Sequence, residues 1–222
     1  MARELKAITD AVKPVLSDLG YRRKGNTFYK ISDNLAFCIM AEHPGLYYVR
    51  FFVIPLYVYQ DQVYLTYGDR LKVCWNGIGD GTPFISQVLA SIQDEVIPFF
   101  NRIDNVPRLL SFLQQDYSCV SPYFFCPKLE ISRLRAYTAL MLHDSLKFHN
   151  AIMETRQLLS ATTSFSRNAV AQSEAELCDL ERLELSPDSV INQYFQVQIM
   201  QNLKKFFPKY KNEDKPIKET VL

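Results

Sequence analysis

The sequence predicts an α+β protein, in which an antiparallel sheet of about five strands packs against two helices and precedes a helical C-terminal half. Three observations predict this order. Apolar residues recur with helical period near the N-terminus, short aromatic and β-branched runs follow, and helical period returns from residue 82 onward. The links between the runs are short, so the strands are antiparallel, because a parallel pair needs a crossover of about a dozen residues.

The first predicted helix has one apolar face with spacings of three and four residues. That face consists of Leu5, Ile8, Val12, Val15, Leu16 and Leu19. Gly20 follows the last of them, where glycine ends a helix at least steric cost. Pro14 lies inside the pattern and predicts a bend or an early second segment, because proline has no N–H to donate.

Five short runs rich in aromatic and β-branched residues come next, and turn clusters separate them, as is typical of strands. The runs span 27–31, 35–42, 46–58, 63–67 and 70–75. Pro55 falls in the third run and indicates a bulge, a break or an edge strand. Gly68 and Asp69 join the last two runs and predict a turn there.

A second helix is predicted after the glycine-rich stretch 76–81. Thr82 is a favourable N-cap, and Pro83 suits the first helical position. One face of this helix is apolar and consists of Ile85, Val88, Leu89, Ile92, Val96, Phe99 and Ile103. We expect it to lie on the sheet beside the first helix.

The rest of the chain reads as helical, apart from an irregular connector at 118–128. The predicted helices are 109–113, 131–142, 146–159 behind an N-cap at Asp144, a segment opened by a capping box of Ser173 and Glu176, and a helix from Ser186 to Phe206. We therefore expect an α+β sheet domain at 1–117 and a helical extension at 118–207 packed on it. A flexible charged tail is expected at 208–222.

Composition excludes a strong electrostatic pull toward polyanions. Lys and Arg number 25 against 24 Asp and Glu, so binding to nucleic acid would have to be local. The N-terminus lacks the apolar core of a signal peptide, and no apolar run approaches the roughly 20 residues of a spanning helix. We expect a cytoplasmic protein with no membrane partner.

Residues that carry chemistry are sparse, and no catalytic, cofactor-binding or metal-binding residue is assigned. The five cysteines include no C-x-x-C pair and are interpreted as buried thiols. His143 and His149 are six residues apart, which is off the one-turn spacing of a helical metal site. Acidic residues crowd 174–184 but alternate with leucines, which predicts a solvated helix face. Motifs of serine hydrolases, dinucleotide binders and P-loop enzymes are absent.

The aromatic surplus is the most informative feature for function, with 15 Phe and 13 Tyr in the chain. A pleated sheet cannot present all of these rings on one side. One set should meet the helices, and the other is covered by the C-terminal helices, by a partner, or remains a tyrosine-rich surface. The candidate binding surface consists of Arg22, Arg23, Lys24, Tyr29, Tyr64, Tyr67, Arg70 and Trp75.

Two readings of the basic run from Arg22 to Lys24 remain open. Cations beside exposed aromatic rings can hold a phosphate backbone or stack on bases. Cations that follow a helix end can equally be favourable charges at the helix C-terminus, with no ligand.

Residues 19–30, LGYRRKGNTFYK, resemble a bacterial family known only as domain of unknown function 4304. Two later pieces are similar in kind: YLTYGDRL at 64–71 and Pro-Phe-Phe at 98–100. The resemblance covers about residues 5–113 and not the C-terminal helices. It implies that Gly20 to Tyr29 is a framework element of a small α+β domain, and it brings no reaction and no catalytic residues.

Together these observations favour a non-enzymatic protein-binding module, immunity-like or adaptor, in a bacterial cytoplasm. The partner is expected to be another protein, and the oligomeric state stays open. The first alternative is a nucleic-acid-associated module that uses the basic and aromatic region from Arg22 to Tyr29, with Arg70 and Lys72. The second alternative is an enzyme with an unrecognised site.

Overall fold

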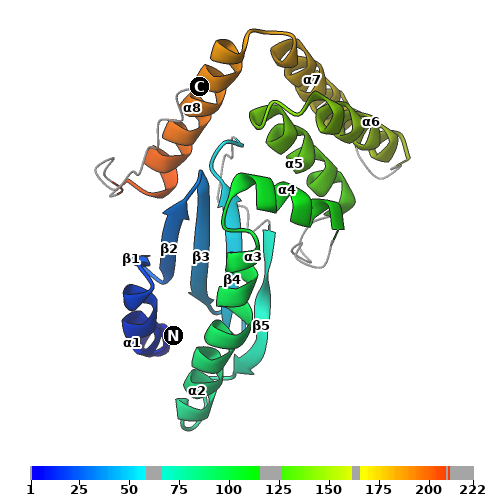
Figure 1. The fold of residues 1–222 in the computed structure, drawn as a ribbon. Coiled ribbons are helices and arrows are strands. Elements are labelled where there is room, and N and C mark those ends of the chain that lie inside the picture. Colours follow the sequence, from blue (N-terminus) through cyan, green and yellow to red (C-terminus); the bar gives the residue numbers. More distant parts are fainter. Residues whose placement is uncertain (1, 59–66, 116–126, 162–165, 209, 211–222) are drawn as a thin grey trace.

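The computed structural model describes residues 2–58, 67–115, 127–161, 166–208 and 210 (Figure 1). It confirms the α+β prediction, because a five-stranded antiparallel sheet occupies the N-terminal half and helices occupy the C-terminal half. The strands are neighbours in sequence order, β1-β2-β3-β4-β5, so the sheet is a simple meander.

The strands are β1 (Arg22–Lys24), β2 (Thr27–Ser32), β3 (Leu35–Glu42), β4 (Tyr47–Pro55) and β5 (Tyr67–Trp75). The tight turn between β2 and β3 consists of Asp33 and Asn34, which both have positive φ, as a two-residue hairpin of the favoured twist requires. β3 has the predicted bounds. β4 ends earlier than predicted, at Pro55, because proline has no N–H for the ladder; the next amide, of Leu56, donates to the Asn34 carbonyl instead.

One strand was not predicted, and one predicted turn is wrong. The basic run Arg22–Lys24, which was not among the predicted strands, is the edge strand β1, paired with β2. Gly68 and Asp69, expected as a turn, lie inside β5 opposite Phe52 and Phe51. A Cβ on Gly68 would lie 1.9 Å from the Phe51 carbonyl oxygen, so glycine is required here by the close approach of β4. The predicted strand 63–67 falls outside the described residues except for Tyr67.

One face of the sheet is covered by the first helices. α1 (Ala2–Asp18) runs through Pro14 and ends in a Schellman motif, with Gly20 at φ 83° and the Tyr21 amide donating to the Leu16 carbonyl. α2 (Thr82–Ser91), a π turn (Ile92–Val96) and α3 (Ile97–Arg102) continue one another. The π turn directly precedes Pro98, which cannot continue the α-helical ladder. Thr82 is the first helical residue and not the N-cap, which is Gly81.

The C-terminal half contains α4 (Val106–Gln115), α5 (Pro127–Met141), α6 (Ser145–Ala161), α7 (Arg167–Glu184) and α8 (Asp188–Phe206). Asp144 caps α6 as predicted, since its carboxylate accepts from the Lys147 amide at 3.0 Å. The predicted capping box is wrong: Ser166 caps α7, and its hydroxyl accepts from the Ala169 amide at 3.2 Å. Ser173 and Glu176 lie inside α7.

The C-terminal end of α8 returns to the sheet (Figure 1), where Phe207 packs on Tyr29 of β2. The Asn202 side-chain amide donates to the carbonyls of Leu56 and Val58, each at 2.7 Å, just beyond the end of β4. Tyr57 contacts both α5 and α8. Its hydroxyl lies 2.8 Å from the Thr138 hydroxyl on α5, and its ring packs edge-on to Phe195 on α8. The helical half is thus hydrogen-bonded and packed onto the sheet.

The central strands are buried on both faces. On β3, Phe37 packs against Phe100 of α3, while the neighbouring Cys38, which points to the other face, is only 1% exposed. On β4, Phe51 contacts Phe99 of α3, and Phe52 on the opposite face is 1% exposed. A tyrosine-rich face open to a partner is therefore not present on these strands.

Candidate functional site

The predicted surface residues do not form one site. Arg23 is structural: its guanidinium donates to Asp10 at 2.8 Å and to the Thr9 hydroxyl at 2.7 Å, both on α1, and it lies over the Phe28 ring. Arg22 and Lys24 alternate with it along β1 and turn to the other side, toward the end of α8. The basic run is therefore divided between two faces.

Two of the predicted surface tyrosines are core residues, which corrects the expectation. Tyr29 is 4% exposed and packs on Phe207 with ring centroids 4.6 Å apart. Tyr67 is 5% exposed and donates to the Glu130 carbonyl of α5. Their rings fill the space between the sheet and the helices, so neither belongs to an exposed surface. Tyr64 lies outside the described residues.

Arg70 and Trp75 lie near the opposite edge of the sheet, on β5. Arg70 donates to Glu42 at 2.5 Å and its guanidinium lies 4.9 Å from the Tyr48 ring centroid. Trp75 packs between Tyr47 and Phe84 and donates to the Ile78 carbonyl at 3.0 Å. These residues stabilise the β5 end and its following loop, far along the sheet from β1.

The helical half contains an open groove. α7 and α8 diverge from the turn between them, and α5 lies beneath the opening (Figure 1). The groove encloses about 570 Å³. Its lining consists of Tyr137, Gln172, Ala175, Glu176, Asp179, Leu180, Arg182, Leu183, Ser186 and Tyr194, and we call it the α7–α8 groove.

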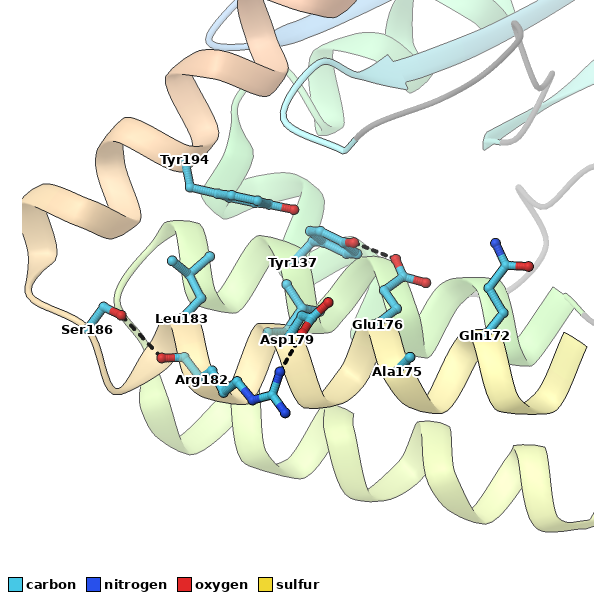
Figure 2. Close-up of a pocket in the computed structure, with 10 residues that line it drawn as sticks. Tyr137, Gln172, Ala175, Glu176, Asp179, Arg182, Leu183, Ser186 and Tyr194 are labelled. Atoms are coloured by element: carbon cyan, nitrogen blue, oxygen red, sulfur yellow. Dashed lines mark hydrogen bonds and ion pairs between the residues drawn. The ribbon is translucent and has the colours of Figure 1, made fainter. Parts of the chain in front are cut away.

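A paired charge cluster forms the floor of the groove. Arg133 of α5 donates to both carboxylate oxygens of Glu176, at 2.6–3.0 Å, and to Glu130 at 3.2 Å. The Tyr137 hydroxyl donates to the same Glu176 carboxylate, as Figure 2 shows. Glu176 is therefore fixed by two side chains of α5.

Burial and neighbouring charges shift the pKa values of three side chains at the groove, Tyr137, Arg133 and Tyr194. Burial raises the pKa of the Tyr137 hydroxyl well above its usual value, and the Glu176 carboxylate adds to this effect. Burial opposes the charge on Arg133, yet Glu176 and Glu130 together raise its pKa. Burial also raises the pKa of Tyr194. Near neutral pH the tyrosines remain protonated and the arginine remains charged, so Arg133 and Tyr137 keep donating to Glu176 and hold α5 against α7.

Exposed apolar side chains continue the groove along α8. Val190 and Val197 are 44% and 45% exposed and lie seven residues apart on the outward face of the helix, with Tyr194 between them. We call Val190, Tyr194 and Val197 the α8 stripe. In the turn that joins α7 to α8, Leu185 is 84% exposed. Apolar surface that is continuous with a groove is typical of interaction sites.

The acidic residues of α7 are partly solvated, as Asp179 is, but several of them also bind neighbouring helices. Arg156 of α6 pairs with Glu181 at 2.7 Å and with Glu174 at 3.3 Å. Glu184 accepts from the Ser145 hydroxyl at 2.7 Å. These carboxylates hold α7 against α6, and Glu176 holds it against α5, so much of the acidic surface serves helix packing.

Sequence reasoning missed Arg133, Tyr137 and the apolar groove. The partners of Glu176 lie about 40 positions earlier in the chain, on a different helix, and no local pattern marks them. Val190 and Val197 did carry a signal, because they lie off the face that includes Ile191, Phe195 and Ile199.

Comparison with known protein families, with curated proteins and with solved structures finds no match to this chain. The resemblance to the domain of unknown function therefore stays a prediction. Within the described residues, no helix combines the length and apolar character needed to span a bilayer. The same residues contain no group of three or more His, Cys, Asp or Glu side chains arranged to hold a metal ion.

Proposed function

We propose that this protein is a non-enzymatic protein-binding module of the immunity or adaptor type, acting in a bacterial cytoplasm. The α7–α8 groove and the α8 stripe receive an apolar segment of its partner. The observation that carries the proposal is an open apolar groove, continuous with an exposed apolar helix face, above a floor whose charges are already paired.

The shape of the groove favours a helical partner segment. Two diverging helices form its walls, and a third amphipathic helix fits such a space by packing its own ridge of apolar side chains between them. Apolar residues at spacings of three, four and seven would meet Leu183, Tyr194 and Val197. The aromatic ring of Tyr194 is the expected anchor, because aromatic side chains dominate the energetics of protein interfaces.

The paired floor favours recognition over catalysis. Glu176 already accepts from Arg133 and Tyr137, so a substrate would have to break these contacts to recruit it as a base. A partner that covers the groove would also leave no unpaired charge there, which avoids the large cost of burying one.

The test compares surface variants in a tagged pull-down from the native host. A double variant, Val190→Asp with Val197→Asp, places two carboxylates on the stripe at positions that are already solvent-exposed. The matched control is Met153→Asp on α6, a residue that is 56% exposed and lies outside the groove. We expect a stoichiometric partner with the wild type and the control, and its loss with the double variant.

Equal recovery of that partner by the double variant would refute the groove as the docking site. Circular dichroism and thermal unfolding of each variant separate a lost contact from a lost fold. Each charge on an exposed position should change the unfolding free energy by less than about 0.5 kcal/mol.

A further inference from the structure

A second hollow lies at the C-terminal end of α8, beside the β1 edge of the sheet. It encloses about 600 Å³ and shares no lining residue with the α7–α8 groove. Its lining consists of Met200, Gln201, Leu203, Lys204, Phe207, Pro208 and Tyr210, and we call it the β1–α8 hollow. Its volume falls in the range of roughly 300–1,000 Å³ that is usual for ligand sites.

Cations from two distant parts of the chain lie close to this hollow. The Arg22 guanidinium lies 5.9 Å from the centroid of the Tyr210 ring, which lines the hollow. The Lys24 amine donates to the Phe206 carbonyl at 2.7 Å, across 182 positions of sequence. Lys204 is exposed on the rim, and Lys205 follows it in the last turn of α8. A protein with a net charge of +1 thus gathers a local basic surface.

The helix end explains part of this arrangement. A lysine that binds a terminal carbonyl, and lysines in the last turn, are both favourable at the negative end of a helix dipole. That effect does not account for Arg22, which lies on an aromatic ring, or for the apolar hollow beneath it. Arg23, by contrast, donates to Asp10 and Thr9 of α1 and to the Gly25 carbonyl, and takes no part.

We propose that the β1–α8 hollow binds single-stranded nucleic acid. A base stacks against Tyr210, and neighbouring phosphates lie on Arg22, Lys24 and Lys204. A basic groove that tracks the backbone, combined with an aromatic ring for a base, is the common design of single-strand binding sites. The Lys24 amine carries three donors and uses one on Phe206, so it can still bind a phosphate oxygen.

The experiment is fluorescence anisotropy of the full chain with labelled oligouridylate and oligothymidylate of about twelve nucleotides, within the usual site size. Salt is varied from about 50 to 200 mM. With three phosphates neutralised, the logarithm of affinity should fall against the logarithm of salt with a slope of about −2, at 0.7 for each contact. The two oligonucleotides distinguish RNA from DNA as the source of the strand.

Two variants separate charge from stacking. Lys204→Ala should make the slope of log affinity against log salt less negative by about 0.7, because one phosphate contact is lost. Tyr210→Ala should weaken binding about 5- to 150-fold and leave the slope unchanged, which is the range measured for loss of one stacked base. The matched control is Lys128→Ala, which removes an exposed lysine from the first turn of α5, outside the hollow, and should change neither quantity.

Three results would overturn the proposal: no binding at about 50 mM salt, unchanged affinity in Tyr210→Ala, or competition by polyglutamate as effective as that by unlabelled oligonucleotide. The last result would show a surface that binds any polyanion, including an acidic protein. Val197→Asp, which lies outside the hollow, should bind oligonucleotide like the wild type. The two proposals therefore fail independently of each other.

Discussion

Replacement of Asn202 by alanine tests how α8 is attached to the sheet. The Asn202 side chain is fully buried, and its amide donates to the carbonyls of Leu56 and Val58 at 2.7 Å each. Alanine leaves both carbonyls buried without these donors, and each such loss costs about 1–3 kcal/mol. The Asn202 carbonyl oxygen is buried with no partner among the described residues, so its removal returns about 1 kcal/mol.

The expected net loss in the free energy of unfolding is therefore about 1–5 kcal/mol. For a chain of this size each kilocalorie lowers the melting temperature by about 2–4 °C. The assay is urea unfolding followed by circular dichroism, with thermal unfolding as a second measure. The matched control is Gln196→Ala, an exposed position on the same helix, which should change the stability by less than about 0.5 kcal/mol. If Asn202→Ala is as stable as Gln196→Ala, α8 is not held to the sheet through this side chain.

Three further perturbations have definite expected outcomes. Gly68→Ala should lower the unfolding free energy by about 3 kcal/mol, at the upper end of overpacking costs, because the Cβ of the alanine would meet the Phe51 backbone. Unchanged urea unfolding would contradict the observed register between β4 and β5. Ser166→Ala should lower the free energy of unfolding by about 1 kcal/mol, measured by thermal unfolding, whereas Ser173→Ala should lower it much less. The reverse order would show that α7 begins nearer to Ser173. Arg156 lowers the pKa of Glu181 by hydrogen bonding, so the stabilisation from this pair is complete above the ordinary pKa of 4.5 and is lost as the pH falls through the lower pKa of the folded protein. Arg156→Met should therefore reduce the loss of unfolding free energy that occurs on acidification. An unchanged loss would disprove the contribution of the Arg156–Glu181 pair.

The fold was predictable where local chemistry and tertiary packing agree. The bounds of β3 follow from an aromatic and β-branched run that begins after the Asp33-Asn34 turn. The end of α1 follows from Gly20, and the start of α6 follows from Asp144, because both are local capping effects. In each case the residues that determine the boundary lie within a few positions of it.

Prediction failed where a distant part of the chain decides the outcome. Gly68 has the chemistry of a turn, yet β5 continues through it because β4 approaches too closely for any side chain. Ser173 and Glu176 have the spacing of a capping box, yet α7 begins at Arg167 and Glu176 lies mid-helix, where it pairs with Arg133 and Tyr137 of α5. Neither the strand approach nor the helix pairing is encoded in adjacent residues.

The candidate sites were less accessible to sequence reasoning than the fold. The sequence drew attention to the basic run on β1, but the division of this run between two faces depends on where α1 and α8 lie. The α7–α8 groove exists because two helices diverge above α5, and that angle is a tertiary property. The exposed valines of α8 give the only local sign that this helix has a second apolar face.

The contacts made by α8 also set an order of events during synthesis. The ring of Tyr29 cannot pack on Phe207, and the segment after β4 cannot bind Asn202, until α8 has been synthesised. Part of the sheet therefore has no permanent cover until α8 leaves the ribosome. Leu56 and Asn202 are 146 positions apart in the chain. The synthesis of that stretch takes roughly 7–30 s at about 5–20 residues per second. During that interval the nascent sheet presents apolar surface and is vulnerable to aggregation and chaperone capture. Shortened chains that stop before Asn202 should remain in that vulnerable condition permanently.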